Sequence, residues 1–166
     1  MIYFTTVIFT LLLAHIARAV PACDDAPSSE DLYDPTYDDF QQPLVTEYKV
    51  KWDYKYDNKY GETKKAACGH GPHGFGHRYP YYKDFPDYPY IGGAYDVKTG
   101  SPNCGKCWKL YNKKTKKAIH FTAMDYASNH GYEVSKEAYV KLGGTPGSGS
   151  MEVEAKQVPP SVCGFK

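Results

Sequence analysis

Beyond residues 2–16 the sequence has no hydrophobic run long enough to cross a membrane, so no membrane span is expected in the rest of the chain. It has no Asn-X-Ser/Thr sequon, and N-glycosylation is therefore not expected. Lysine and arginine are missing from residues 20–46, which hold seven acidic residues. Residues 47–166 contain 19 Lys or Arg against 12 Asp or Glu, a formal charge of +7. The near-neutral net charge of the whole chain is therefore the sum of two segments of opposite charge.

The amino-terminal segment has the pattern of a secretory signal. Residues 2–16 are almost wholly apolar and precede Ala17-Arg18-Ala19, which places small residues at the −3 and −1 positions. A membrane anchor is the alternative, but a spanning helix needs about 20 apolar residues and this run breaks at His15 and Arg18. The pattern predicts a signal peptide at residues 1–19 and a secreted protein, extracellular or associated with the cell wall.

The acidic segment at residues 20–46 is rich in proline and has no sustained hydrophobic period. So little apolar surface cannot offset the entropy cost of ordering the chain, so the segment is predicted to be a disordered arm. A solubilising tail or pro-segment is the favoured interpretation over an arm lying on the basic domain. Cys23 lies in this arm, where it would stay free or link two molecules.

Residues 47–166 read as one small, mostly β domain. Alternation of apolar and polar residues predicts strands at residues 47–56, 106–111, 118–123 and 151–158. The polar run NKKTKK between the second and third of these predicts a hairpin loop. One short helix is expected over residues 135–142, with Ser135 as N-cap and Gly143 ending it.

Four cysteines, Cys68, Cys104, Cys107 and Cys163, lie in the domain. In a secreted chain they predict two disulfides, with three connectivities open. The Cys104-Gly-Lys-Cys107 motif also invites a redox interpretation, which needs a reactive thiolate at a helix start. The motif lies between a Gly-Ser-Pro-Asn turn and a predicted strand, so structural bridging is favoured.

Several motifs, in order, resemble the cerato-platanins, small secreted fungal proteins. They are YDNKYG (residues 56–61), PYIGG (89–93), GSPNCGKCWKL (100–110), AIHFTAMDYA (118–127), SKEAYVKL (135–142) and KQVPPSVCG (156–164). The resemblance covers the whole domain. It implies a mainly β fold, a six-stranded double-psi β-barrel with one or two short helices, and disulfides Cys68–Cys104 and Cys107–Cys163.

The resemblance also implies a function, and it implies no cofactor. Family members bind chitin-type N-acetylglucosamine oligomers, act on cell-wall material without true hydrolysis, and are perceived by plants as elicitors or phytotoxins. The expected partners are therefore chitin oligomers or other wall polysaccharides and plant surface receptors. A monomer that is not an enzyme is expected.

Asp125 is the first candidate site residue, because it follows an alternating strand and precedes a Ser-Asn-His-Gly turn. The alternative interpretation is that Asp125 only forms a turn, since aspartate is common at such positions. The resemblance implies instead that this residue contacts the glycan. It also places Gly131 and Glu133 in the site. Asp53, predicted to lie on the first strand, is the best second carboxylate, since glycoside hydrolysis normally needs two. If the protein is hydrolytic, Asp125 would be the acid and Asp53 the base.

Aromatic side chains are the other half of the predicted site. Residues 79–90 contain five tyrosines and one phenylalanine among three prolines, so several rings are expected at the surface, where sugar faces stack on them. Tyr90, beside a predicted turn at Ile91-Gly92-Gly93, is the chosen ligand contact. Trp108 is assigned to the core.

Two further signals do not change this prediction. His70, His73 and His77 share a glycine-rich loop but have no acidic or free-thiol partners, so no metal site is predicted. The basic domain has dispersed lysines, and secretion argues against a nucleic-acid partner. Three functions are weighed: a non-catalytic glycan binder and elicitor, which is favoured; a weak glycan hydrolase; and a surface-active structural protein of the secreted layer.

Overall fold

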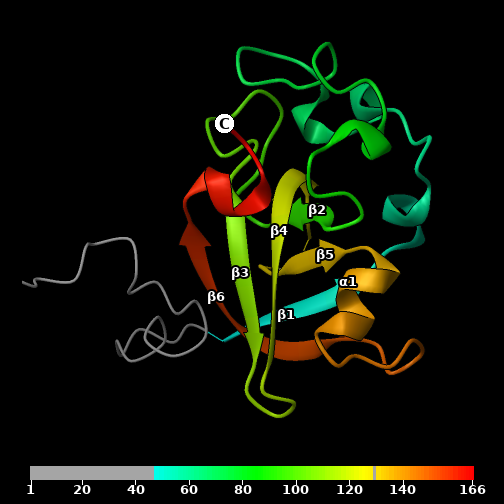
Figure 1. The fold of residues 1–166 in the computed structure, drawn as a ribbon, viewed down its shortest axis with the longest axis vertical. Helices are drawn as coiled ribbons and strands as arrows, with labels where there is room; N and C mark the ends of the chain where they lie inside the picture. Colours follow the sequence, from blue (N-terminus) through cyan, green and yellow to red (C-terminus); the bar gives the residue numbers. More distant parts are fainter. Residues whose placement is uncertain (1–46, 129) are drawn as a thin grey trace, which may run out of the picture. The chain divides into compact units, whose positions relative to one another are not determined.

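The computed structural model describes residues 47–128 and 130–166, in which six β-strands close into a barrel (Figure 1). The order around the barrel is β1-β5-β2-β4-β3-β6. The strands are β1 (Glu47–Trp52), β2 (Ile91–Ala94), β3 (Cys107–Asn112), β4 (Lys117–Tyr126), β5 (Tyr132–Val134) and β6 (Met151–Val158). The helices are α1 (Lys136–Lys141) and the 3-10 turns η1 (Tyr54–Asp57), η2 (Thr63–Lys65), η3 (Ala67–Gly69), η4 (Tyr82–Asp84) and η5 (Pro160–Cys163). The predicted fold class is confirmed.

Local hairpins and long-range crossings build the barrel together. β3 and β4 form the predicted antiparallel hairpin, and β6 pairs antiparallel with both β3 and β1. Two pairs are parallel, β1 with β5 and β2 with β4, and parallel neighbours require crossover connections. The connection from β1 to β2 carries η1 to η4 and gathers at one end of the barrel (Figure 1).

The strands at residues 106–111, 118–123 and 151–158 are confirmed to within a few residues. The first strand ends at Trp52 rather than at residue 56, because the Asp53 side chain accepts a hydrogen bond from Lys55 N at 3.0 Å and begins η1. The predicted turn at Ile91-Gly92-Gly93 is wrong, since these residues form β2. A Cβ on Gly92 would lie 2.0 Å from the Glu133 carbonyl oxygen, so glycine there permits close strand pairing rather than a turn.

The predicted helix is confirmed. The Ser135 side chain accepts a hydrogen bond from Ala138 N at 3.2 Å, which is the expected N-cap interaction. Ala138, Tyr139 and Leu142 are fully buried. Gly143 follows in the left-handed region with φ of +94°, which suits the end of a helix.

Two disulfides staple the barrel, Cys68–Cys104 and Cys107–Cys163, as the family resemblance implies. Cys104 and Cys107 belong to different bridges, so the redox interpretation of their motif is not supported. Trp108 is 8% exposed and packs in the barrel core as predicted.

The aromatic segment at residues 79–90 is less exposed than expected. Tyr82 and Phe85 are buried in a second apolar cluster with Tyr56, Ile91 and Met124. Within this segment only Tyr81 is a large exposed aromatic, at 43%. The rings pack inward because the chain between β1 and β2 must build its own small core beside the barrel.

The predicted signal peptide at residues 1–19, the acidic arm at residues 20–46 and Cys23 lie outside the described residues. Among the residues that the structure describes, no helix is long and apolar enough to span a membrane.

Candidate functional site

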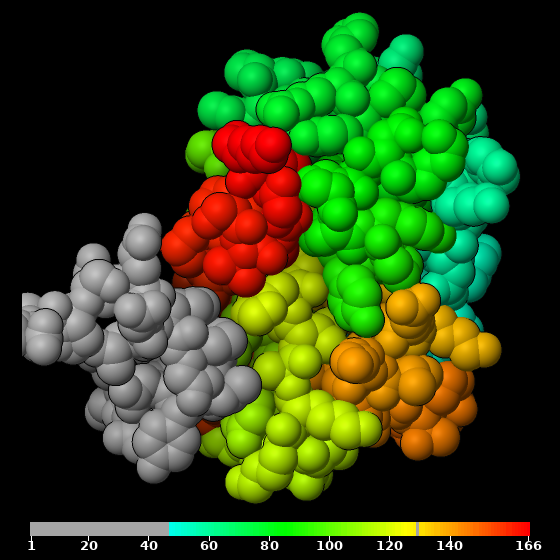
Figure 2. Space-filling view, viewed as in Figure 1, coloured from blue at the N-terminus to red at the C-terminus, as the bar shows by residue number. Residues whose placement is uncertain are grey.

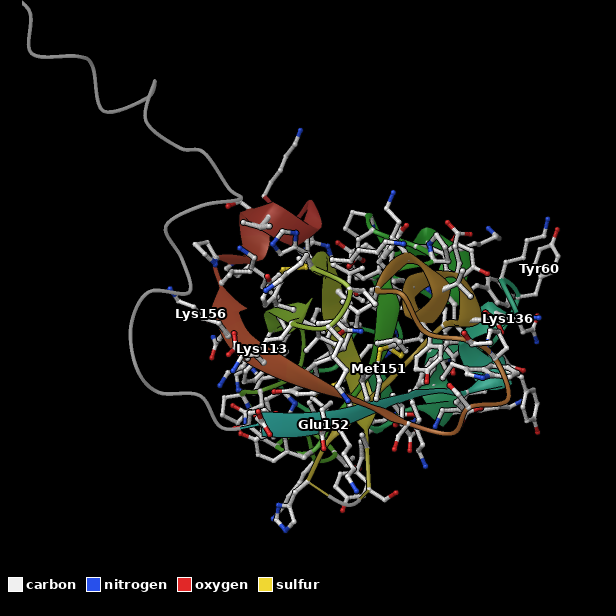
Figure 3. The ribbon with its side chains drawn as sticks, turned by 90° about the horizontal axis from the view of Figure 1, so that it is seen from below. Tyr60, Lys113, Lys136, Met151, Glu152 and Lys156 are labelled. Carbon is white, nitrogen blue, oxygen red and sulfur yellow. A yellow bond between two sulfur atoms is a disulfide. The ribbon has the colours of Figure 1, made fainter. Side chains whose placement is uncertain are left out.

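Asp125 lies near the end of β4 beside a surface hollow of about 530 Å³, here called the Asp125 groove. Its lining residues are Tyr54, Lys55, Asn58, Tyr60, Gly61, Glu62, Lys65, Tyr82 and Asp125. Most of them come from the connection that follows β1. Tyr60 projects from one edge of the molecule, far from Lys113 and Lys156 (Figure 3). Asp125 therefore lies close to a strand end, as its place after the strand predicted at residues 118–123 indicates, and it lines a hollow.

A bulge in β4 directs Asp125 toward this groove. Gly92 pairs with Ala123 and the next residue, Gly93, pairs with Asp125, so Met124 is the extra residue. If side chains alternated strictly along β4, Asp125 would lie on the same face of the strand as Phe121 and Ala123, which pack in the barrel core. The bulge instead buries Met124 in the second cluster and releases Asp125 to the groove.

Four donors hold the Asp125 carboxylate. Oδ1 accepts hydrogen bonds from the backbone N–H groups of Ala67 at 2.8 Å and Tyr126 at 2.9 Å. Oδ2 accepts a hydrogen bond from the Tyr56 hydroxyl at 3.4 Å and lies 3.2 Å from Lys55 Nζ. The side chain keeps 15% of its surface exposed. The carboxylate is therefore fixed in place but open to a ligand on one side.

Lys55 joins three carboxylates into one cluster. Its ammonium nitrogen lies 3.2 Å from Asp125, 3.6 Å from Glu133 and 3.7 Å from Asp53. Glu133 also pairs with Lys51 at 3.0 Å. Glu133 is nearly buried, and a buried charge is tolerated only when it is paired in this way.

The cluster changes the proton affinity of its neighbours. Burial by itself would lower the pKa of Lys55, but Asp125, Glu133 and Asp53 outweigh it, so this pKa is raised. Burial, assisted by the same carboxylates, raises the pKa of Tyr56 well above its usual value. The pKa of Tyr82 is also raised, first by burial and then by Asp125. Tyr56 therefore remains a hydrogen-bond donor to Asp125 at neutral pH.

Exposed aromatic rings flank the cluster. Tyr54 is 78% exposed and Tyr60 is 60% exposed, and both line the Asp125 groove. Tyr126, next to Asp125, is 50% exposed. A fixed carboxylate beside open phenol rings can accept hydrogen bonds from hydroxyl groups while a ring face covers an apolar surface.

The structure brings some of the predicted site residues together and separates others. Asp53 and Glu133 meet Asp125 through Lys55, although Asp53 lies after β1 and not on it. Tyr90 lines a different hollow, and Gly131 packs its backbone against β1, where an added Cβ would lie 2.3 Å from Lys49 O. Neither of these two belongs to the Asp125 groove.

Sequence reasoning missed Lys55, Tyr54 and Tyr60, because it placed the first two on a strand and gave Tyr60 no role in the site. One sequence signal was available: Asp53, an aspartate able to cap a turn, directly precedes Tyr54 and Lys55. It could have predicted a turn here instead of a continued strand. Among residues 47–128 and 130–166, His70, His73 and His77 included, no three His, Cys, Asp or Glu residues are arranged so that they could hold a metal ion.

A family model described as cerato-platanin matches residues 48–165, about seven-tenths of the chain. The chain belongs to the cerato-platanin family. The match includes both disulfides and the four charged residues that meet around Lys55, here called the Lys55 cluster: Lys55, Asp53, Asp125 and Glu133.

Relatives within this family come from fungi. The chain is 36% identical over 129 residues to the heat-stable 19 kDa antigen of Coccidioides posadasii, covering 75% of this chain and 86% of that protein. It is 32% identical over 118 residues to allergen Asp f 15 of Aspergillus fumigatus, covering 69% and 75%.

Solved cerato-platanin structures share the barrel. Cerato-platanin 2 from M. perniciosa superposes with a TM-score of 0.68 at 30% identity, covering 72% of this chain and 100% of that one. The solution structure of the fungal elicitor cerato-platanin has a TM-score of 0.64 at 30% identity, covering 69% and 95%.

Proposed function

We propose that this chain is a secreted, non-catalytic carbohydrate-binding protein that holds cell-wall glycan, such as chitin-type N-acetylglucosamine oligomers, in the Asp125 groove. The observation that carries the proposal is the fixed, partly exposed Asp125 carboxylate beside the exposed rings of Tyr54 and Tyr60. Sugar rings offer apolar faces to phenol rings and hydroxyl donors to a carboxylate, so this groove presents both kinds of contact.

The neighbours of Asp125 favour binding over hydrolysis. A general acid must hold a proton that it can pass to the leaving group, but each contact of Asp125 is with a donor: two backbone N–H groups, a phenol and an ammonium. The same ammonium also approaches Asp53, the best candidate for a base. A hydrolase needs its two carboxylates on opposite sides of the scissile bond, whereas here Lys55 Nζ contacts both of them.

Secretion and a role in host recognition have separate support. Two long-range disulfides suit an oxidising, extracellular environment. One solved relative is described as a fungal elicitor, and curated relatives are described as an antigen and an allergen, so host organisms meet proteins of this family. We infer that this protein acts outside a fungal cell and that a host perceives it.

An NMR titration with N-acetylglucosamine oligomers tests the binding proposal. The backbone amides of Ala67 and Tyr126 donate to Asp125, so their signals report directly on a ligand at that carboxylate. We expect both signals to shift, while those of Gly147 and Gly149, in the loop between α1 and β6 and outside the groove lining, do not. An Asp125→Asn variant should lose most of the shift, and a Glu152→Gln variant, which changes an exposed carboxylate elsewhere, should retain it. Unchanged spectra at millimolar oligomer would refute the proposal.

A further inference from the structure

Another hollow among the described residues, here called the Asp87 hollow, has a volume of about 440 Å³ and shares no lining residue with the Asp125 groove. It is lined by Asp87, Tyr88, Tyr90, Ala118, Ile119, His120, Lys141, Val162 and Cys163. In Figure 2 these segments meet where the red carboxyl-terminal turn, the green aromatic segment, the yellow strand β4 and the orange helix α1 come together. Four stretches of chain, remote in sequence, therefore build one concave surface.

The lining of the hollow combines apolar and polar side chains. Ile119 is 4% exposed, and the rings of Tyr88 and Tyr90 are half-buried. His120 and Lys141 bring polar nitrogen atoms from β4 and α1. Rings and a few convergent polar groups are the common composition of a small-molecule site.

Asp87 adds a buried acceptor to this composition. Its Oδ2 accepts a hydrogen bond from Thr122 Oγ1 at 2.7 Å. Its Oδ1 is buried and has no hydrogen-bond partner among the described residues. An unpaired buried acceptor costs free energy, so a donor that reached Asp87 Oδ1 after a small movement of the side chain would be stabilised.

The backbone holds Asp87 and Tyr90 rigidly in this arrangement. Tyr90 N donates to Asp87 O at 2.7 Å, and Thr122 N donates to Tyr90 O at 3.0 Å. Tyr88 is tied to the first connection, because its hydroxyl donates to Asp57 O at 2.9 Å. The two rings and the carboxyl group are therefore preorganised, which lowers the entropy cost of binding.

We propose that the Asp87 hollow is a second carbohydrate subsite, in which a sugar ring packs on Tyr90 and hydrogen-bonds to Asp87 and Lys141. The choice of ligand rests on the proposed function of the Asp125 groove. The position of the Asp87 hollow does not depend on that proposal, because the two hollows share no lining residue. Tyr90, which lies outside the Asp125 groove, would contact the sugar in this second subsite.

Two separate subsites would let one molecule bridge two glycan chains. Ile119 and Asp125 lie on the same strand, six residues apart, which corresponds to roughly 20 Å of extended chain. This spacing is too long for one sugar ring to touch both residues. Bridging through a rigid strand would link or separate neighbouring polysaccharide chains without breaking a bond.

An NMR titration of isotope-labelled protein with N-acetylglucosamine hexamer distinguishes the two sites. We expect two groups of shifted signals, one at Ala67 and Tyr126 and the other at Ile119, His120 and Lys141. A Val162→Arg variant places a long side chain at the exposed rim of the hollow, and should weaken binding in the second group about tenfold while leaving the first unchanged. Ser161→Arg is the matched control, since the exposed Ser161 does not line the hollow. A Lys141→Ala variant changes an exposed residue of the same hollow and should weaken the second group as well.

The outcomes separate the two proposals. If only the first group shifts, or if Val162→Arg and Lys141→Ala both leave the second group unchanged, the second subsite is refuted and the Asp125 groove stands. If only the second group shifts, the Asp87 hollow is supported and the proposed function of the groove fails. If neither group shifts, both proposals fail for this glycan. Capture of a fluorescent oligomer by protein already bound to insoluble chitin, lost in Val162→Arg and kept in Ser161→Arg, would support bridging.

Discussion

Lys55 Nζ lies 3.2 Å from Asp125 Oδ2 and thereby places a positive charge beside the carboxylate that is central to the groove. The same ammonium also contacts Asp53 and Glu133, so one lysine pairs with three acids from three different parts of the chain. This pairing stabilises the cluster and also limits what chemistry Asp125 can perform.

Replacing Lys55 with methionine should lower the free energy of unfolding by about 1–2 kcal/mol at neutral pH. The value is below that of a fully buried pair because Lys55 is 37% exposed and water screens its charge. Urea unfolding monitored by tryptophan fluorescence measures the loss. The matched control is Lys65→Met, which removes a lysine 74% exposed and should cost less than about 0.5 kcal/mol.

The stabilisation by Lys55 should also depend on alkaline pH. Its pKa is raised above 10.5 in the folded protein, after the carboxylates outweigh burial. Stabilisation is therefore complete below the unfolded-state value and is lost as pH rises through the folded-state value. The difference between wild type and Lys55→Met should be constant from pH 7 to 9 and shrink above about pH 10.5. A difference that persists unchanged at higher pH would show that packing, and not charge, is responsible.

The Lys55 cluster should prevent hydrolysis. Wild-type protein should release no more reducing sugar from chitin or cellulose than Asp125→Asn does, because Asp125 is surrounded by donors. The measurement is a reducing-end assay over long incubation, with a true glycosidase as positive control. Release that is clearly higher for wild type, and lost in Asp53→Asn, would assign the acid and base roles to this pair.

Asp87 should make stability depend on pH in the opposite sense to an ordinary paired carboxylate. Burial raises its pKa from 3.8 to about 7, although the Thr122 hydrogen bond opposes the change. Between these values the folded protein binds a proton that the unfolded chain does not, so the contribution of Asp87 to stability falls as pH rises. His120, Lys141, Tyr88 and Tyr90 face the same hollow and are unchanged in the variant proposed here.

The test is Asp87→Asn, which keeps an oxygen acceptor for Thr122 Oγ1 but does not ionise. Relative to wild type, this variant should gain stability from pH 4 to 7, by up to roughly 1.4 kcal/mol per pH unit. Urea unfolding at several pH values gives the comparison. A gap between the two proteins that does not change over this range would contradict the account of Asp87.

The two disulfides should differ in their effect on the groove. Cys68 follows Ala67, whose N–H donates to Asp125, so the Cys68→Ala/Cys104→Ala variant should weaken glycan binding as well as stability. The Cys107→Ala/Cys163→Ala variant is the matched control and should leave the groove intact. Each should cost about 4 kcal/mol in unfolding free energy on the chain-entropy model. Equal glycan affinity in the two variants would show that Ala67 is held without the bridge.

Local signals were enough to predict part of this fold. The β3–β4 hairpin, β6 and α1 were predicted because their alternation, turn residues and Ser135 cap depend on neighbours in sequence. β2 and β5 were not, because each is three or four residues long and is defined by partners far along the chain. The number of strands came from the resemblance to the family.

The site, like the fold, has features that local sequence predicts and features that depend on residues far along the chain. Asp125 was found from its position after a strand, but the bulge at Met124 that turns it toward the groove depends on pairing with Gly92 and Gly93. Lys55 reads as one of many lysines in the sequence, and only the folded chain places it among three carboxylates. Tyr90 was predicted to contact the ligand because it adjoins the turn expected at Ile91-Gly92-Gly93, but those residues form β2 and Tyr90 lines a different hollow.

The most direct test of the Asp125 groove is the affinity of the folded protein for N-acetylglucosamine hexamer, measured by calorimetry for wild type and for Asp125→Asn. We predict a loss of about tenfold or more in the variant, since a charged acceptor is replaced by a neutral one. Glu152→Gln should match wild type. Equal affinity of Asp125→Asn and wild type would contradict the assignment of the groove.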